Sequence, residues 1–425
     1  DTINGGDGSD VLQVAGSFAS YTITRPSATD TVLTGASGNV LTVRNTEYIV
    51  FTDGGRTMDD IWGNIPSSGD DHLHGTSGVD VIDGGVGNDT MEGGLGNDVY
   101  VLSSPDDVVI EGANAGMDSV GLAFTKSATY YLPANVEHAI VVAAGSIAVN
   151  VTGNELANWI IGNGGANILG GGDGNDTLQG LGGADTLIGG TGNDIYIVDG
   201  AATKAVVVEN DGEGIDQVTT DLSAYKLTDN VENLFARTQS WSGVRNFTGT
   251  GNALDNVINA SYCTSARLDG GAGNDRLIDS GGNDSLSGGD GDDRLEVTGG
   301  KDIVDGGSGY DTMVLYYYLG AASTFKVKQV NAADILLTNT SGYSATVRGV
   351  ESFIFNGVTL SLEQLTQNLH GVGTSADVSA SLKTSGIGMA YNHVISSGES
   401  TQIAVLTGTP SNTTADYYFI DYVPA

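Results

Sequence analysis

A nine-residue repeat recurs along this chain of 425 residues. Its pattern is G-G-x-G-x-D-x-U-x, where U is a large apolar residue, and "GGVGNDTME" at 84–92 is followed without a gap by "GGLGNDVYV" at 93–101. A short fixed period means that every unit makes the same contacts with its neighbours, which is the property of a solenoid. The repeat therefore predicts an elongated stack of coils instead of one compact core.

Each repeat unit predicts a tight turn followed by a strand of about three residues. The apolar residue points inward and its two neighbours point outward, because side chains alternate along a strand. Two units make one coil, successive coils pair as parallel strands, and glycine provides the positive φ that such sharp turns require. The predicted interior residues are Leu73, Ile82, Met91, Tyr100, Leu178, Leu187, Tyr196, Leu277, Leu286, Leu295, Ile303 or Val304, and Met313.

The aspartate of each unit lies in the turn and keeps the nine-residue phase within four clusters. In stacked coils, aspartates two units apart meet at the same edge, where their carboxylates repel each other. Ca²⁺ removes this repulsion, since it binds about six to eight oxygens, here carboxylates and backbone carbonyls. The predicted calcium ligands are Asp10, Asp71, Asp80, Asp89, Asp98, Asp176, Asp185, Asp194, Asp275, Asp284, Asp293, Asp302 and Asp311. The pairs 71/89, 80/98, 176/194, 275/293, 284/302 and 293/311 have aspartate in both coils, so we expect about six calcium ions or more.

The charge of the chain supports cations as partners and excludes polyanions. Acidic residues outnumber basic ones by 52 to 16, so a nucleic acid or an anionic membrane surface would be repelled. No apolar run approaches the length of a membrane span. Cys263 is the only cysteine, which rules out an intrachain disulfide and leaves metal binding and packing to hold the fold.

The repeats resemble the RTX (repeats in toxin) family, whose signature is this nonapeptide. The units "GGDGNDTLQ", "GGTGNDIYI" and "GGAGNDRLI" match it almost position for position, and the repeats cover roughly a third of the chain. The resemblance implies an all-β, right-handed parallel β-roll that folds when it binds calcium. It also implies export from a Gram-negative bacterium by type I secretion, and a place outside the cell or on its surface.

Some units depart from the signature. Asn158, Asn167 and Asn256 occupy aspartate positions, and because an amide carries no charge we expect weak or no calcium binding there. The stretch 260–269 is ten residues long and has no glycine, which predicts a bulge or loop that carries Cys263.

The segments between the repeats are themselves duplicated. "NVEHA" at 135–139 matches "NVENL" at 230–234, and Val43-Arg44 with Glu47 matches Val347-Arg348 with Glu351. The first pair belongs to strand-rich extensions that continue or flank the sheet. The second belongs to antiparallel modules that cap the open ends, each followed by a brief helical piece, at 55–64 and 361–369. The expected organisation is partial repeats at 1–13, a β capping module at 14–65, repeats at 66–103, an extension at 104–152, repeats at 153–198, an extension at 199–248, repeats at 249–314, a second capping module at 315–366, and a C-terminal β region or secretion signal at 367–425.

Catalytic motifs are missing from the sequence. No H-E-x-x-H motif of a metalloprotease and no G-x-S-x-G motif of a lipase occurs, so we expect no enzymatic activity. His72 and His74 share the outer face of one strand, where they form either a transition-metal site or a solvated pair. Glu111, Asp118, Glu209 and Asp216 form either an additional cation site or the polar groups of turns.

Taken together, these features predict a calcium-binding extracellular protein with a structural or adhesive function in a surface layer, a filament or a matrix. Calcium is the expected partner, with self-association or a cell-surface or glycan ligand beyond it. Two alternatives stay open, namely the carrier end of a larger exported enzyme or toxin, and a glycan-binding module. The chain begins inside a repeat, at "DTINGGDGSD", so we expect further sequence N-terminal to it.

Overall fold

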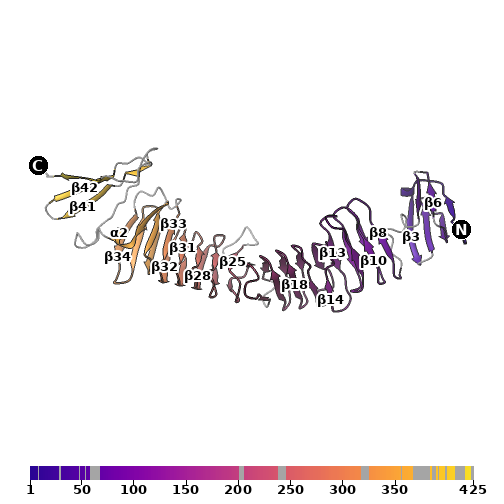
Figure 1. The fold of residues 1–425 in the computed structure, drawn as a ribbon, viewed down its shortest axis with the longest axis horizontal. Coiled ribbons are helices and arrows are strands. Elements are labelled where there is room, and N and C mark those ends of the chain that lie inside the picture. Colours follow the sequence, from indigo (N-terminus) through magenta and orange to yellow (C-terminus); the bar gives the residue numbers. More distant parts are fainter. Residues whose placement is uncertain are drawn as a thin grey trace. The chain divides into compact units, whose positions relative to one another are not determined.

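The computed structural model describes residues 1–7, 9–27, 30–46, 48–52, 54–57, 68–200, 205–237, 246–316, 325–355 and 357–366, together with short strands at 383–384, 389–390, 392–397, 400–406 and 417–422. These residues fold almost entirely as β-strands, which Figure 1 draws as arrows. The chain divides into two compact units, Asp1–Asp216 and Gln217–Ala425. The predicted all-β fold is confirmed.

Three parallel sheets form the solenoid of the first unit. One has the order β12-β10-β8, and the others contain the odd-numbered strands β9 to β21 and the even-numbered strands β14 to β22. Their bounds are β8 His72–His74, β9 Val81–Asp83, β10 Thr90–Glu92, β11 Val99–Leu102, β12 Val108–Ile110, β13 Ser119–Leu122, β14 Ala128–Tyr131, β15 His138–Val141, β16 Val149–Thr152, β17 Trp159–Ile161, β18 Ile168–Asp173, β19 Thr177–Gln179, β20 Thr186–Thr191, β21 Ile195–Val198 and β22 Val206–Val208.

Two sheets form the solenoid of the second unit in the same way, with the odd-numbered strands β23 to β33 and then β37 on one side, and the even-numbered strands β24 to β32 on the other. Their bounds are β23 Gln217–Thr220, β24 Ala224–Lys226, β25 Asn233–Ala236, β26 Asn246–Thr250, β27 Val257–Asn259, β28 Ser265–Ala272, β29 Arg276–Ile278, β30 Ser285–Asp290, β31 Arg294–Val297, β32 Lys301–Ser308 and β33 Thr312–Leu315, with the further members β34 Phe325–Gln329, β35 Ile335–Asn339, β36 Ser344–Arg348, β37 Ser352–Phe355 and β38 Val358–Ser361.

The register of the repeat strands is the predicted one. Thr90 pairs with His72 and Thr177 with Trp159, so one coil spans two nonapeptides. All predicted interior residues are buried, and of the two candidates at the start of β32 the buried one is Val304, whereas Ile303 is 59% exposed. Each nonapeptide therefore contributes one apolar side chain to the interior, and these side chains stack in a column.

The extensions between repeat blocks continue the same coils. β13 pairs in parallel with β11, β15 with β13, and β17 with β15, so the strands at 119–141 extend the sheet that the repeats begin. Their coils are longer than those of the repeats, since Asp98 stacks on Asp118, 20 residues further on. The expectation that the extensions continue the sheet is confirmed.

The irregular stretch at 260–269 is a turn followed by a strand. The backbone N–H of Cys263 donates to the carbonyl of Ala260 at 2.8 Å, which closes the turn, and the Cys263 side chain is buried. The loop is shorter than predicted, however, because β28 already begins at Ser265. The extra residue lengthens this coil, so that Val257 pairs with Arg276, which lies nineteen residues further on instead of eighteen.

The terminal modules have matching topologies. The first contains β1 Thr2–Asn4, β3 Tyr21–Ser27, β4 Asp30–Gly35 and β5 Val40–Arg44 in the order β1-β5-β4-β3, and the second has the order β32-β36-β35-β34. In both modules the first two strands of this order pair in parallel, and the remaining pairs are antiparallel. The first module also contains β2 Val11–Gln13, the 3-10 helix η1 Phe18–Ser20, β6 Tyr48–Phe51 and β7 Gly54–Thr57.

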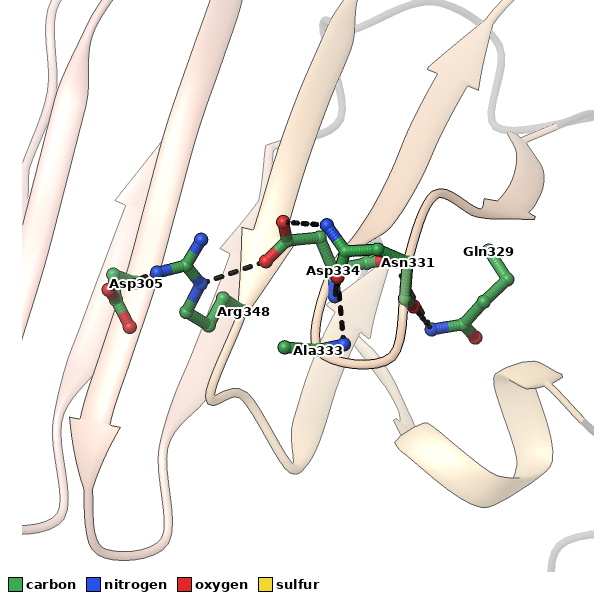
Figure 2. A network of polar contacts seen from close by, with 6 residues as sticks. All are labelled: Asp305, Gln329, Asn331, Ala333, Asp334 and Arg348. Carbon is green, nitrogen blue, oxygen red and sulfur yellow. Dashed lines mark hydrogen bonds and ion pairs between the residues drawn. The ribbon is translucent and has the colours of Figure 1, made fainter.

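An ion pair occupies the same place in both modules. Figure 2 shows Arg348 donating from Nε to Asp334 Oδ1 at 2.8 Å, with Asp305 on its other side at 3.9 Å. Asn331 closes the turn by donating from Nδ2 to Asp334 Oδ2 at 2.6 Å. In the N-terminal module, Arg44 makes the equivalent pair with Asp30. The duplication that the sequence indicates therefore extends to side-chain contacts.

The two predicted helical pieces differ in the structure. α2 Leu362–Thr366 is the second one, and residues 367–369 of that prediction lie outside the described part. The first, predicted from Gly55, is wrong as far as Thr57, because this segment is β7 and pairs antiparallel with β6. The rest of it, 58–64, lies outside the described residues.

The C-terminal part is described only as short strands. They are β39 Lys383–Thr384, β40 Met389–Ala390, β41 Asn392–Ser397, β42 Ser400–Leu406 and β43 Tyr417–Tyr422. The sheet β41-β42-β43 is antiparallel, and most of the predicted secretion signal or β region lies outside the described residues. In the part of the chain that is described, no helix has the length and apolarity that a bilayer crossing requires.

Candidate metal centres along the aspartate edges

The repeat aspartates link successive coils through one carboxylate oxygen. Asp89 Oδ1 accepts a hydrogen bond from the backbone N–H of Asp71, at 2.8 Å, and Asp194 Oδ1 accepts one from Asp176 at 2.7 Å. The same bond joins the other predicted pairs, which are 80/98, 275/293, 284/302 and 293/311. The structure thus brings all six pairs together, each through a backbone amide and a carboxylate.

The second carboxylate oxygen of most repeat aspartates is buried without a hydrogen bond. Among the predicted ligands in the described residues, this holds for the Oδ2 atoms of Asp89, Asp98, Asp176, Asp185, Asp194, Asp275, Asp293, Asp302 and Asp311. A buried acceptor without a donor costs about 1–3 kcal/mol, and more when it is charged. Because this unfavourable arrangement recurs in successive repeats, it indicates that a ligand binds beside these oxygens.

The first glycine of each turn leaves space beside that oxygen. A Cβ added at Gly171 would lie 2.5 Å from the carbonyl oxygen of Gly189 and even closer to Asp176 Oδ2. Gly288 has the same surroundings, formed by Asp293 Oδ2 and the carbonyl of Gly306. Both oxygens are acceptors, and a cation satisfies two acceptors that face the same space. Hard oxygen ligands of this type suit Ca²⁺.

Burial raises the pKa of the edge carboxyls in the metal-free chain. Burial raises the pKa of Asp176, Asp275 and Asp302 to about 7, from an ordinary value of 3.8, and neighbouring carboxylates add to the effect. Asp89 and Asp293 are raised to about 6, again mainly by burial. These carboxylates are therefore destabilised as anions unless a positive charge accompanies them.

Glu296 illustrates a buried carboxylate that has such a charge. It is fully buried, and it accepts hydrogen bonds from Arg276 Nε at 2.8 Å and Arg294 Nε at 2.6 Å. Burial raises its pKa, but the hydrogen bonds from Arg276, Tyr316 and Arg294 outweigh burial and the pKa is lowered. Asp176, Asp275 and Asp302 show the opposite shift, which indicates that their counter-charge comes from outside the chain.

The asparagine units satisfy their own turns. Asn167 Oδ1 accepts from the N–H of Asn163 at 3.0 Å, and Asn167 Nδ2 donates to the carbonyl of Val149 at 2.7 Å. Asn158 and Asn256 bond in the same manner, with donors reaching the carbonyls of Val136 and Val231. The amide N–H groups supply donors that a carboxylate lacks, which is consistent with the expectation that these turns bind calcium weakly or not at all.

Three predicted ligands have different surroundings. Asp80 Oδ2 accepts from the backbone N–H of Thr76 at 2.6 Å, and both oxygens of Asp284 accept from Ser280 Oγ, at 2.7 and 3.0 Å. Asp10 lies in the N-terminal module, where its carbonyl accepts from the N–H of Tyr48 as that of Asp311 accepts from Ser352. The protein itself provides donors to Asp80 and Asp284, but burial still raises the pKa of Asp284.

Two equivalent buried triads close the first and second repeat blocks. Their ligand atoms lie within 4.8 Å of one another, and the members are Asp98, Glu111 and Asp118 in one and Asp194, Glu209 and Asp216 in the other. A tyrosine hydroxyl lies beside each triad. Tyr100 Oη borders the space next to Gly93 together with oxygens of Asp98 and Glu111, and Tyr196 Oη does the same next to Gly189. Burial raises the pKa of Glu209 to about 9, with further contributions from Asp216 and Asp194. These clusters favour the cation-site interpretation over the turn-forming one.

Sequence reasoning missed several members of the edges. Asp107, Glu137 and Glu351 accept backbone hydrogen bonds from Asp89, Asp118 and Asp311, at 2.9, 2.7 and 2.9 Å, and so occupy the next position in each ladder. Asp279 forms a third buried cluster with Asp284 and Asp302. These residues lie outside the nonapeptide signature, and only Glu137 and Glu351 had a signal, as matched positions in the duplicated segments.

The comparisons with known proteins agree with this geometry. The family of the RTX calcium-binding nonapeptide repeat (4 copies) matches residues 1–14, 66–100, 152–178, 170–200, 269–302 and 280–313. No curated protein matches the chain significantly. The matched segments contain the aspartate edges, so the chain carries calcium-binding RTX repeats on a β-roll.

Proposed function

We propose that this calcium-binding RTX-repeat protein is a structural or adhesive component of a bacterial surface or extracellular matrix, exported by type I secretion. Calcium acts as its folding switch, and the ions bind along the aspartate edges. The chain would remain expanded in calcium-poor cytosol and would fold outside the cell, because an ion that binds only the folded form contributes its binding free energy to folding.

The proposal of calcium-dependent folding is supported by the buried Oδ2 atoms that have no hydrogen bond. Such atoms recur from Asp89 to Asp311, and burial raises the pKa of both of these carboxyls. Without ions the folded edges hold carboxylates that oppose one another, whereas in an expanded chain water solvates them. Calcium reverses this preference by supplying two positive charges at each site.

An apolar outer face supports the structural or adhesive function. On the sheet that contains β9 to β17, the outward side chains include Val81, Val99, Ile140 and Trp159, which are 64%, 37%, 41% and 47% exposed. Val81 and Val99 are direct register partners. Exposed apolar side chains that pair across strands, as Val81 and Val99 do, are typical of a contact surface when they lie on the outside of a highly acidic protein.

Circular dichroism and sizing of the full chain test the switch. With EDTA we expect an expanded coil, and with millimolar Ca²⁺ a compact, β-rich protein, while Mg²⁺ at the same concentration has little effect because it prefers a smaller octahedral site with bound water. A compact β-rich chain in EDTA would refute the switch.

Electron microscopy of the calcium-loaded chain tests the assembly. We expect lattices or fibres from the wild type, and their loss in a Val81→Thr, Ile140→Thr, Trp159→Gln variant whose dichroism is unchanged. A matched control is Ile168→Thr with Val206→Thr, which alters exposed apolar residues of the other sheet. If the wild type stays monomeric at high concentration, a carrier function for an exported enzyme becomes the better explanation.

A further inference from the structure

A cluster of histidine and glutamate side chains lies on the outer face of the first coils of the first unit. His72 and His74 flank the buried Leu73 on β8, so both point outward. The neighbouring strand β10 places Glu92 directly opposite His74 in the parallel register. Three candidate metal ligands thus project from one side of a two-strand scaffold.

The separations of the ligand atoms fit one metal ion. His72 Nε2 lies 2.9 Å from Glu92 Oε1, and His74 Nδ1 lies 3.3 Å from Glu92 Oε2. With metal–ligand bonds of about 2.1 Å, neighbouring ligands of one ion are about 3.0 Å apart at right angles and about 3.4 Å apart in a tetrahedron. All three ligand atoms lie within 4.8 Å of one another, so a small closure of the side chains brings them around one ion.

We propose that His72, His74 and Glu92 form a binding site for a divalent transition metal, with Zn²⁺ as the best match. Two imidazole nitrogens and one carboxylate are ligands that Zn²⁺ prefers, whereas Ca²⁺ selects oxygen ligands and avoids imidazole. The side chains are 55%, 41% and 38% exposed, so an ion reaches them from solvent and keeps water as its remaining ligands. The site is therefore chemically separate from the aspartate edges.

The site would also join two successive coils. β8 and β10 contribute two ligands and one, and the three approach one another only when these strands are paired. Zinc therefore binds the folded roll better than the expanded chain and favours the folded state. By linkage, zinc lowers the calcium concentration needed for folding, and calcium strengthens zinc binding by the same factor.

Calorimetric titration of ZnCl₂ into the full chain tests the site. The titration is done in excess Ca²⁺, so that the aspartate edges do not compete for zinc. We expect one zinc ion per wild-type chain, and loss of this ion in the double variant His72→Gln, His74→Gln, since glutamine keeps polarity but offers no imidazole. Glu92→Gln weakens binding about tenfold or more, because a direct ligand contributes at least as much as the outer partners of a metal site.

His138 provides the matched control. It lies on β15, packs its ring against Trp159 at a centroid distance of 5.9 Å, and belongs to none of the candidate ligand clusters of the described residues. His138→Gln should bind zinc as the wild type does. All variants should have wild-type dichroism in calcium, because the altered side chains are exposed or half-buried. The proposal is overturned if the wild type binds no zinc, or if the double variant binds it equally well.

A second measurement separates a metal site from a histidine–glutamate contact that has no ligand. The calcium midpoint of folding, followed by dichroism, should move to lower calcium when zinc is added to the wild type, and should not move in the double variant. An identical midpoint in both proteins, with and without zinc, would contradict the proposed link between β8 and β10. This readout does not depend on the adhesive or structural function of the chain.

Discussion

Asp98 Oδ1 accepts a hydrogen bond from the backbone N–H of Asp80 at 2.8 Å, one coil earlier, while Asp98 Oδ2 is buried and has no hydrogen bond. One oxygen therefore fixes the register of the coils, and the other requires a cation. Because the two functions belong to different atoms of one side chain, substitutions can separate them.

Substitution of Asp176 by asparagine or alanine tests this separation. Asp176→Asn removes the charge but keeps a polar side chain, as the natural Asn167 does, so we expect loss of calcium at this edge with the fold retained in high calcium. Asp176→Ala also removes the acceptor for the N–H of Asn158, bonded at 2.6 Å, and should cost about 1–3 kcal/mol more in unfolding free energy. Calorimetric stoichiometry and urea unfolding in calcium measure the two effects. An unchanged number of bound ions in Asp176→Asn would contradict the assignment.

A methyl group at a turn glycine should block a calcium site. In Gly288→Ala the new Cβ would meet Asp293 Oδ2 and the carbonyl of Gly306 at distances that real Cβ atoms do not adopt. We expect a higher calcium midpoint of folding and a loss of stability of about 1–3 kcal/mol, as for overpacked sites. Gly281→Ala is the control in the same block, since nothing lies within 4 Å of its Cβ position. Equal midpoints for the two variants would argue against an ion beside Gly288.

The two triads should each hold one calcium ion. Glu209→Gln removes one anionic ligand next to Asp194 and Asp216, and we expect one fewer tightly bound ion per chain, with the same loss in the equivalent Glu111→Gln. Glu155 is exposed and belongs to no candidate cluster in the described residues, so Glu155→Gln serves as control. Calorimetry in competition with a calcium chelator counts the ions. If both triad variants retain the wild-type number, the glutamates only shape the turns.

The period of the sequence predicts the interior better than it predicts the edges. Leu73, Met91 and Leu178 are buried as expected, because side-chain alternation and an eighteen-residue coil are both local properties of the nonapeptide. The acidic residue that follows the last repeat aspartate is not set by these local properties. Glu351 accepts the hydrogen bond from the N–H of Asp311 although the two residues are 40 positions apart, with a module between them. That partner depends on where the longer chain segment returns to the sheet, which the repeat does not encode.

Individual turns escaped prediction for a different reason. Thr76 and Ser280 stand where the signature has a glycine, and they donate to Asp80 and Asp284. The aspartate itself keeps its phase in both units, so the nonapeptide pattern alone does not reveal that a side-chain hydroxyl already donates to it. A hydroxyl residue four positions before the aspartate is not a sufficient signal, because Thr298 has this position before Asp302 and donates to Asp279 instead.

Acidification should partly replace calcium. Burial raises the pKa of Asp275 and Asp302 to about 7, whereas the ordinary value of 3.8 applies in the unfolded chain. Protonation therefore favours the folded state: this contribution is fully present below about pH 4 and is lost as the pH rises through about 7. We expect the calcium-free chain to gain β-structure as the pH is lowered from 8 to 5, with a smaller pH dependence in Asp275→Asn and Asp302→Asn. Dichroism of chain dialysed free of calcium measures this, and a spectrum that stays that of a coil throughout would mean that the buried carboxyls do not control folding.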